Sequence, residues 1–241
     1  MSIAMTTART APHAHAIAAK SLRWTLPAAT PAGDEDLQAL QRMGVKLRFA
    51  RNEMIFNEGD EADYSYKVVS GAIRLCKHMA DGRRQIADFV LPGDFCGFLH
   101  LNEHRYTAEA TSDTVVMCYQ QRQIEQMGEQ MPSMRKRLLG FLAQRLSGMQ
   151  DHLMMLGRQT AKERVISFLL MMAEHAGSDE GDAIVLPMSR QDIADYLGLT
   201  IETVCRVLSD LKRARLIALP DLHRVVLLDI DNLHALADGE E

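Results

Sequence analysis

Short runs of hydrophobic and β-branched residues, separated by turn residues, fill the chain between Val45 and Gln120. Regularly punctuated strands of this kind are typical of a β-barrel or jelly roll. Asp81-Gly82 is in addition a favourable turn for a β-hairpin. The strands are expected at Lys46–Phe49, Met54–Phe56, Tyr66–Val69, Ala72–Lys77, Gln85–Val90 and Thr114–Tyr119.

After this region the hydrophobic spacing becomes that of helices. We expect a short helix at Arg122–Met127, a break near Met131-Pro132, and a long helix from about Ser133 to Leu156. The hydrophobic residues of the long helix follow the 3-4-3-4-3 spacing of a coiled-coil seam, which predicts a dimerisation helix. A helix buried against its own barrel is the alternative. The predicted dimerisation residues are Leu139, Leu142, Leu146, Met149, Leu153 and Leu156.

The C-terminal third alternates short helices with short strands. Gly157 is expected to act as a hinge, and Thr160 to Glu163 form a capping box that begins the next helix. Two strands around a turn predict a β-hairpin of the kind found as the wing of a winged helix. The strands are expected at Ala183–Leu186, Leu216–Leu219 and Arg224–Leu228, and a final helix at Asp231–Ala237.

Residues 189–208 have the pattern of two helices joined by a tight turn. Ser189 can cap the first helix, with Asp192 three residues later as in a capping box. Gly198 ends that helix, because glycine enters the left-handed conformation cheaply, and Thr200 can cap the second helix. This layout predicts a helix-turn-helix, whose second helix enters the DNA major groove. The apolar stripe of the second helix is Ile201, Val204, Leu208 and Leu211.

The opposite face of the second helix has side chains suited to reading bases. Arg206 can donate two hydrogen bonds to guanine, and Glu202, one turn earlier, can accept a hydrogen bond from cytosine N4. An ordinary amphipathic helix pair with a solvated outer face is the alternative. The further candidates are Thr203 and Cys205 for bases, and Ser189, Arg190 and Thr200 for phosphates.

The chain has 241 residues, enough for two modest domains, and a formal net charge of −5. A negative total argues weakly against DNA binding, but attraction depends on local fields. Basic residues that could contact phosphates surround the proposed site. They are Arg190, Arg206, Lys212, Arg213, Arg215 and Arg224.

Several other protein classes are not expected. No apolar run approaches the roughly 20 residues of a membrane span, and no signal-peptide core is present, so we expect a cytoplasmic protein without a membrane partner. The four scattered cysteines form neither a disulfide framework nor a CxxC metal motif. We therefore expect no metal site, and we find no catalytic constellation.

These patterns together predict an α+β protein of four parts. Residues 1–33 are expected to be a flexible N-terminal arm, because they are rich in alanine and threonine and contain several prolines. Residues 34–132 are expected to form a sensory β-barrel, 133–158 the dimerisation helix and 159–241 a winged helix-turn-helix domain.

Residues 188–208 resemble the DNA-binding helices of the superfamily of the cAMP receptor protein and the fumarate-nitrate reductase regulator (CRP/FNR), and most of all its FixK group. The barrel stretch resembles the cyclic-nucleotide-binding domain of the same superfamily at Glu58-Gly59-Asp60, Ser70-Gly71 and Gly93-Asp94-Phe95. The resemblance implies a homodimer on a palindromic TTGA-type operator, activation through RNA polymerase, and control of low-oxygen genes.

Two departures from the family pattern matter. FixK recognition helices usually read Glu-x-x-Ser-Arg, whereas the serine position here is Cys205. Cyclic-nucleotide binders use a Gly-Glu-Leu cassette followed by Arg-Ser or Arg-Thr, whereas this chain has Gly97-Phe98-Leu99 and then Arg105-Tyr106-Thr107. Phenylalanine cannot replace the ribose-binding carboxylate, so we expect no bound cyclic nucleotide.

Other cofactors of the superfamily are not expected either. An oxygen-sensing iron–sulfur cluster would need most of its four cysteines near the N-terminus, but the first cysteine is Cys76. Cys76-Lys77-His78, like Cys96 with His100, has a spacing that haem could use, although such strand positions are more often ordinary. A cyclic-nucleotide- or haem-binding sensor module that controls a partner protein is the alternative function.

Cys205 is a candidate redox switch. It lies beside Arg206 near the N-terminal half of the recognition helix, and both features favour the oxidisable thiolate. On a helical wheel it falls at the flank of the polar face, so an inert, half-buried thiol is the alternative.

Overall fold

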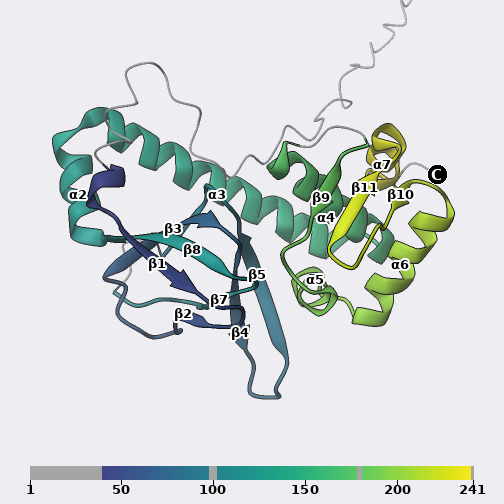
Figure 1. Cartoon of the computed structure of the whole chain (residues 1–241), viewed down its shortest axis with the longest axis horizontal. Coiled ribbons are helices and arrows are strands. Elements are labelled where there is room, and N and C mark those ends of the chain that lie inside the picture. The colour runs from purple at the N-terminus through teal and green to yellow at the C-terminus, as the bar shows by residue number, and fades with distance from the viewer. Residues whose placement is uncertain (1–39, 98–101, 178–180, 240–241) are drawn as a thin grey trace, which may run out of the picture.

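The structure, a computed structural model, describes residues 40–97, 102–177 and 181–239. The predicted N-terminal arm, together with Phe98, Leu99 and His100, lies outside the described residues. Figure 1 shows a β-barrel at one end, a bundle of short helices at the other, and one long helix behind both.

The N-terminal part is a jelly roll of two four-stranded antiparallel sheets, as predicted. The strand orders are β1-β8-β3-β6 and β2-β7-β4-β5. Their facing surfaces enclose a hydrophobic core that includes Val68, Ile73 and Val116, all at most 1% exposed. The strands are β1 (Val45–Phe49), β2 (Met54–Phe56), β3 (Tyr64–Ser70), β4 (Ile73–His78), β5 (Arg84–Val90), β6 (Phe95–Cys96), β7 (Thr107–Ala110) and β8 (Thr114–Gln120).

Two of these strands were not expected from the sequence. The segment β7 reads Thr-Ala-Glu-Ala, whose alanines and glutamate are depleted in strands, yet it pairs with both β2 and β4. The two-residue β6 is too short to give an alternating pattern. In both cases the neighbouring strands, rather than local propensity, determine the conformation.

The hairpin between β4 and β5 turns at Asp81-Gly82, as predicted. Gly82 has a φ of 84° and its N–H donates to the Met79 carbonyl at 2.9 Å. The Met79 N–H donates in turn to the Arg83 carbonyl at 2.8 Å. The hairpin extends well beyond the rest of the barrel (Figure 1).

Two helices follow the barrel, α2 (Gln121–Gln130) and α3 (Pro132–Arg158). Proline at the first position of α3 suits a helix start, because the missing N–H would have no partner there. The helix continues through Gly157, so the predicted hinge at that glycine is wrong. Only Gln159 and Thr160 separate α3 from the next helix.

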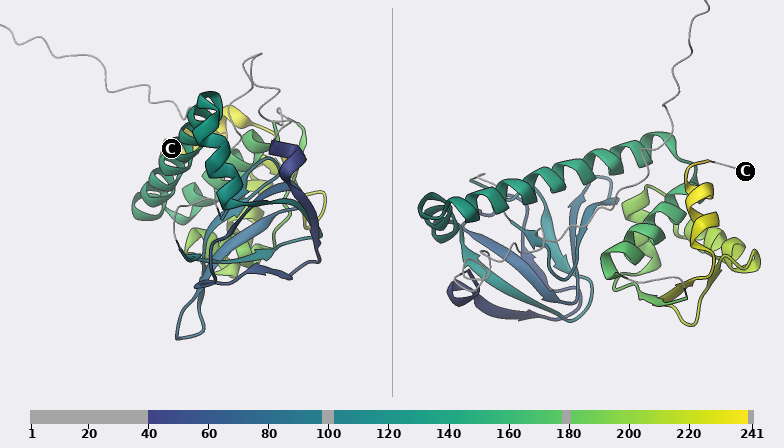
Figure 2. Two further views of the ribbon diagram at one scale, coloured as in Figure 1. Left: turned by 90° about the vertical axis from the view of Figure 1, so that its left-hand side faces the viewer. Right: turned by 90° about the horizontal axis from the view of Figure 1, so that it is seen from above.

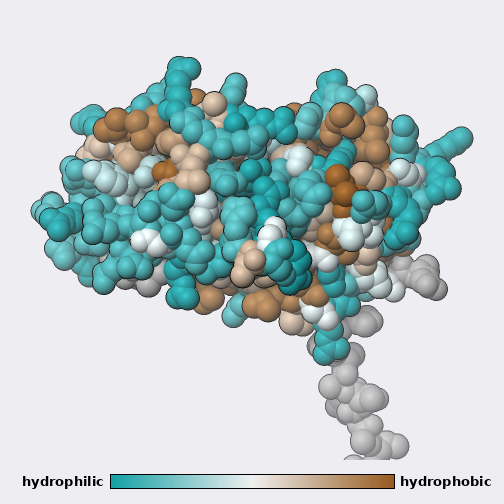
Figure 3. All heavy atoms as spheres, turned by 90° about the horizontal axis from the view of Figure 1, so that it is seen from below, coloured by the Kyte–Doolittle hydropathy of each residue, from teal (hydrophilic) through white to brown (hydrophobic). Residues whose placement is uncertain are grey.

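The two faces of α3 differ in environment. One face packs on the barrel through Met134 and Phe141, which contact Phe95 and Tyr119 in a shared core. The predicted seam lies on another face and is largely exposed. In the single chain Leu139 is 61%, Leu146 59%, Met149 54% and Leu153 70% exposed, while Leu142 and Leu156 are half-buried. Seen from below, hydrophobic residues also reach the surface along the lower edge, the side that carries α3 (Figure 3).

The C-terminal part is a winged helix-turn-helix, as predicted. Its sheet has the order β10-β11-β9, and the hairpin of β10 and β11 forms the wing. Figure 2 shows it packed beside the far end of α3. The elements are α4 (Ala161–Ala176), β9 (Ala183–Val185), α5 (Arg190–Leu197), α6 (Ile201–Arg213), β10 (Ile217–Ala218), β11 (Arg224–Leu227) and α7 (Ile230–Ala237).

The barrel and the C-terminal part share one hydrophobic core. Phe89 of β5 lies 6.2 Å from the Phe168 ring of α4 and 5.2 Å from the Tyr196 ring of α5, between ring centroids. Cys76 and Ile86 of the barrel belong to the same buried cluster. The outer face of β4 and β5 therefore serves as the platform on which α5 rests.

Candidate nucleic-acid interface

The first helix of the helix-turn-helix, α5, begins with a complete capping box. Ser189 Oγ accepts from the Asp192 N–H at 3.1 Å and donates to Asp192 Oδ2 at 2.7 Å. The Ser189 N–H donates to the same carboxylate oxygen at 3.0 Å. The Ser189 hydroxyl is thus already engaged within the helix cap.

The turn between the helices is fixed by glycine and threonine. Gly198 closes α5 with a φ of 63°, a conformation that costs glycine no steric strain. Thr200 then caps α6, since its hydroxyl accepts from the Thr203 N–H at 3.3 Å. The two threonine hydroxyl oxygens lie 3.1 Å apart. Thr200 is exposed at the start of α6 and Thr203 is half-buried beside it.

The second helix, α6, has one buried face and one exposed face. Val204, Val207, Leu208 and Leu211 are buried, and Ile201 is half-buried. Val207 was missing from the predicted stripe and completes it. The exposed face carries Glu202, Cys205, Arg206, Ser209 and Asp210.

Arg206 is available for a ligand. Its side chain is exposed, and within the described part of the chain no hydrogen bond or ion pair engages its guanidinium. Glu202, one turn earlier, is exposed too. Hydrogen bonds from its own N–H and from Thr200 lower the pKa of its carboxyl, so Glu202 is an ionised acceptor at neutral pH. The helix thus presents a free donor and an ionised acceptor side by side.

Cys205 lies on the exposed face of α6 and not at a half-buried flank. Arg190 of α5 is half-buried nearby, and its Nη1 atom has no hydrogen-bond partner among the described residues. Burial lowers the pKa of the Arg190 guanidinium, and negative charge on Cys205 acts in the opposite sense. The exposed Cys205 thiol therefore lies within electrostatic reach of the Arg190 guanidinium.

The wing is tied to the rest of the domain through polar contacts. His223 Nδ1 lies 3.2 Å from the Leu186 carbonyl, beside β9. Arg224 pairs with Asp221 at 2.6 Å, and Arg213 at the end of α6 pairs with Asp210. Lys212 and Arg215 are exposed between them. The basic residues proposed as phosphate contacts thus lie on or next to α6 and on the wing, except Arg190, which is half-buried at the start of α5.

One arginine that the sequence did not single out joins three segments. Arg164 of α4 donates to the carbonyls of Leu156 at 2.8 Å, Gln159 at 3.0 Å and Leu197 at 3.0 Å. These carbonyls belong to the last turn of α3, the linker and the end of α5. We call this arrangement the Arg164 clamp. No spacing rule reveals it, because its acceptors are backbone atoms.

A second group of contacts holds α5 against the barrel. Asp192 is 3% exposed, and its Oδ1 accepts from Arg74 at 3.1 Å and from Arg84 at 2.6 Å. Arg84 also donates to Asp195 at 2.8 Å. Burial tends to raise the pKa of Asp192, but hydrogen bonds from Ser189 and the two arginine charges outweigh it, so the pKa is lowered. These residues are more than 100 positions apart, beyond the reach of sequence patterns.

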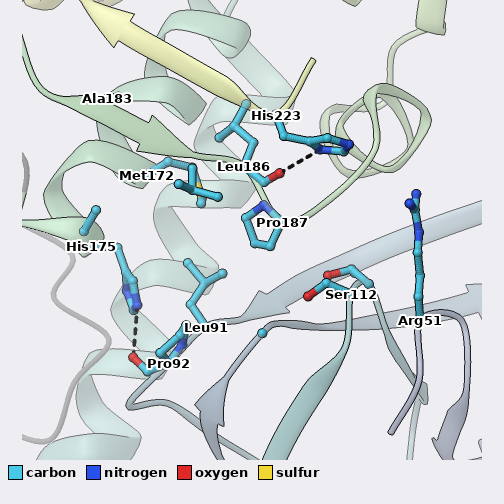
Figure 4. A pocket seen from close by; sticks show the side chains of 14 residues that line it. Arg51, Leu91, Pro92, Ser112, Met172, His175, Ala183, Leu186, Pro187 and His223 are labelled. Carbon is cyan, nitrogen blue, oxygen red and sulfur yellow. Dashed lines mark hydrogen bonds between the residues drawn. The ribbon is translucent and has the colours of Figure 1, made fainter. Parts of the chain in front are cut away.

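A cavity of about 830 Å³ opens between the barrel and the C-terminal part. Leu91 and Pro92 line it from the barrel, and Met172 and Leu186 from the other side (Figure 4). His175 bonds the Pro92 carbonyl across the boundary at 3.3 Å. The cavity is mainly apolar, with the Arg51 side chain along one side (Figure 4).

The residues that correspond to a nucleotide cassette are only partly described. Arg105 is exposed, and Gly97 packs so closely that a Cβ there would lie 2.8 Å from the Tyr64 carbonyl oxygen. Beside it His104 stacks on Phe56, with ring centroids 3.7 Å apart. Burial lowers the pKa of His104, which favours the neutral ring. Aromatic rings thus fill this part of the barrel.

Comparison with known proteins matches two families along the chain. Residues 46–131 match the cyclic nucleotide-binding domain, and residues 163–236 match the Crp-like helix-turn-helix domain. The nitrogen fixation regulation protein FixK of Azorhizobium caulinodans is 41% identical over 222 residues, which are 90% of each chain. FixK of Rhizobium meliloti is 41% identical over 76% of this chain and 83% of its own.

Among solved structures, FixK2 of Bradyrhizobium japonicum has a TM-score of 0.76 at 39% identity. The match covers 80% of this chain and 96% of FixK2. Within the described residues, no helix is both long enough and apolar enough to cross a membrane.

Proposed function

Because the chain belongs to the CRP/FNR family and is a DNA-binding transcription regulator of the FixK type, we propose that it acts as a homodimer on a palindromic TTGA-type operator. On this proposal it activates low-oxygen genes through contact with RNA polymerase in the cytoplasm. It has no catalytic role. The observation that carries the proposal is the exposed Arg206, which has no partner among the described residues, beside the ionised Glu202 on α6.

Base reading is assigned to the exposed face of α6. Arg206 supplies a bidentate donor for guanine O6 and N7, and Glu202 accepts from cytosine N4 or orients Arg206. Thr203 and Cys205 contribute the neighbouring contacts. Arg190 and Thr200 hold phosphates, with Ser189 acting through the backbone N–H groups that its cap arranges at the start of α5.

Dimerisation is assigned to the exposed seam of α3. One face of α3 carries four large hydrophobic side chains that are each more than half exposed. Their contact with water is unfavourable in free energy for a monomer, and a second copy of the helix would bury them. Two-fold symmetry would then present two α6 helices to half-sites about 34 Å apart. The palindromic operator follows from that symmetry.

Binding is proposed to need no cyclic nucleotide, haem or iron–sulfur cluster. The sequence supports this through Phe98 in place of the ribose-binding glutamate. The stacked rings of Phe56 and His104 support it from the structure, because they take up interior space beside Gly97.

Selection of bound sequences from a random DNA pool tests the proposal directly. The reduced protein, freed of metals and nucleotides, should enrich a palindrome with TTGA-type half-sites. A gel shift with the enriched DNA then measures affinity. Enrichment of no sequence, or of a non-palindromic one, would contradict the proposal.

A further inference from the structure

Three side chains with metal-binding chemistry converge on the outer face of β4. Cys76 and His78 are two residues apart on this strand and therefore point to the same side. Glu109 comes from the neighbouring strand β7, where it is opposite Arg74 and diagonal to Cys76. Their donor atoms all lie within 4.8 Å of one another.

Thiolate, imidazole and carboxylate are together the ligand types that zinc accepts. Metal–ligand distances of about 2.0–2.3 Å would place tetrahedral ligands roughly 3.5 Å apart, so the three donors need to approach by about 1 Å. His78 is exposed, which leaves its side chain room to rotate, whereas Glu109 is half-buried and held by Arg74. We propose that Cys76, His78 and Glu109 bind a divalent transition-metal ion of the zinc class.

The surroundings favour one divalent cation. Near the triad, the charges of Arg74 and Arg84 face those of Glu109, Asp192 and Asp195, which leaves one negative charge unbalanced. Cys76 adds a second when its proton leaves to solvent as the metal–sulfur bond forms. Burial raises the pKa of the metal-free thiol to about 11, so the metal has to displace that proton.

A β-bulge lies at this position of the hairpin. The pairing of β4 with β5 shifts between Leu75, opposite Asp88, and Cys76, opposite Ile86. Bulges re-aim side chains and are enriched beside functional sites. Here the extra residue is Ala87 of β5, so the bulge lies opposite Leu75 and Cys76 while β4 itself stays regular.

The site is connected to the DNA-binding half through one arginine. Arg74 donates to Glu109 at 2.7 Å and also to Asp192 of α5 at 3.1 Å. A metal ion that takes Glu109 as a ligand competes with Arg74 for that carboxylate. Metal binding is therefore linked to the contact that seats α5 on the barrel, and through it to operator affinity.

Cobalt(II) titration of the metal-free, reduced full-length protein tests the site itself. One equivalent per chain should give the near-ultraviolet charge-transfer band of a cobalt–thiolate bond, and zinc should displace it. Cys76→Ser should abolish the band. His78→Ala, at an exposed position that the fold does not need, should weaken cobalt binding at least about tenfold.

Two matched cysteine variants control the cobalt experiment. Cys118→Ser removes a half-buried thiol of the same barrel, and Cys205→Ser removes the exposed thiol of α6. Both should retain the band. The absence of a band in the wild type, its loss in Cys205→Ser, or its full retention in His78→Ala would overturn the proposed site.

Operator binding with and without zinc tests the link, which rests on the proposed function. Zinc should change the affinity of the wild type for its operator. It should leave the operator affinity of His78→Ala unchanged. Equal affinities with and without zinc, or the same change in both proteins, would overturn the link. Failure of the wild type to bind any operator would contradict the proposed function and leave the cobalt result standing.

Discussion

Replacing Arg206 with alanine isolates the proposed base contact. The side chain is exposed and unpartnered within the described residues, so its loss should change the free energy of unfolding by no more than about 0.5 kcal/mol. A bidentate contact to guanine contributes about 1–3 kcal/mol of discrimination per half-site. With two half-sites the loss is about 2–6 kcal/mol, or about 30-fold to about 10⁴-fold in the ratio of operator to random-DNA affinity.

Fluorescence anisotropy at one fixed salt concentration measures this ratio, because affinities for DNA depend steeply on salt. Three duplexes are needed: the operator, an operator with the guanine replaced in one half-site, and random DNA. Arg206→Ala should bind the first two almost equally. Arg213→Ala is the matched control, since Arg213 is an exposed arginine paired with Asp210 on the same helix. It should weaken binding to every duplex by the same factor.

An equal loss of affinity for operator and for random DNA would refute the assignment of Arg206 to base reading. If Arg206→Ala weakens binding to the operator and to random DNA by the same factor, Arg206 contacts phosphate and carries no sequence information. If the free energy of unfolding of Arg206→Ala also falls, the loss of DNA affinity reflects a damaged fold. The assignment of Arg206 as a base contact then fails.

Four further predictions concern other parts of the chain. Leu146→Asp should place a charge in the α3 interface and yield monomers by light scattering, whereas Ser147→Asp, outside the seam, should remain dimeric. Reduced protein should shift its operator in a gel without cyclic nucleotide, haem or iron, as Phe98 implies, and a requirement for any of them would refute this. Peroxide should weaken operator binding through Cys205 but spare Cys205→Ser, and equal losses would eliminate the switch. Asp192→Asn should lower the urea-unfolding free energy at neutral pH by about 1.5–3 kcal/mol, because it removes the charged acceptor that Arg74 and Arg84 share, although each arginine keeps a second carboxylate. Since the pKa of Asp192 is lowered, this cost should shrink as acid protonates the carboxylate below its ordinary pKa of about 3.9, and a pH-independent cost would contradict the assignment.

The elements that sequence patterns located are those whose signals are local. The caps at Ser189 and Thr200, the end at Gly198 and the hairpin turn at Gly82 each depend on residues within one turn. These signals placed the helix-turn-helix almost to the residue. The face of α6 followed from periodicity, so the exposed positions of Glu202 and Arg206 were predictable too.

The features that the sequence did not reveal depend on long-range contacts. Strand β7 forms because β2 and β4 lie on either side of it, whatever its own propensity. The pairing of Arg74 with Asp192 joins residues from different domains, and the Arg164 clamp uses backbone acceptors that every residue possesses. Neither interaction can be recognised from the spacing of residues along the sequence. The exposure of Cys205 likewise depends on how α5 and α6 pack together.

The Arg164 clamp and the two-residue linker couple the helix-turn-helix rigidly to the C-terminal end of α3. The 27 residues of α3 make a rod about 40 Å long, and the clamp fastens its end to the end of α5. Rotation of the rod about its axis must then carry the helix-turn-helix around with it. In a dimer, a change of register between the two α3 helices would rotate both α6 helices together and change the distance between them. On the proposed dimer, the pairing of α3 would therefore set the length of the spacer between half-sites, far from the residues proposed to touch DNA.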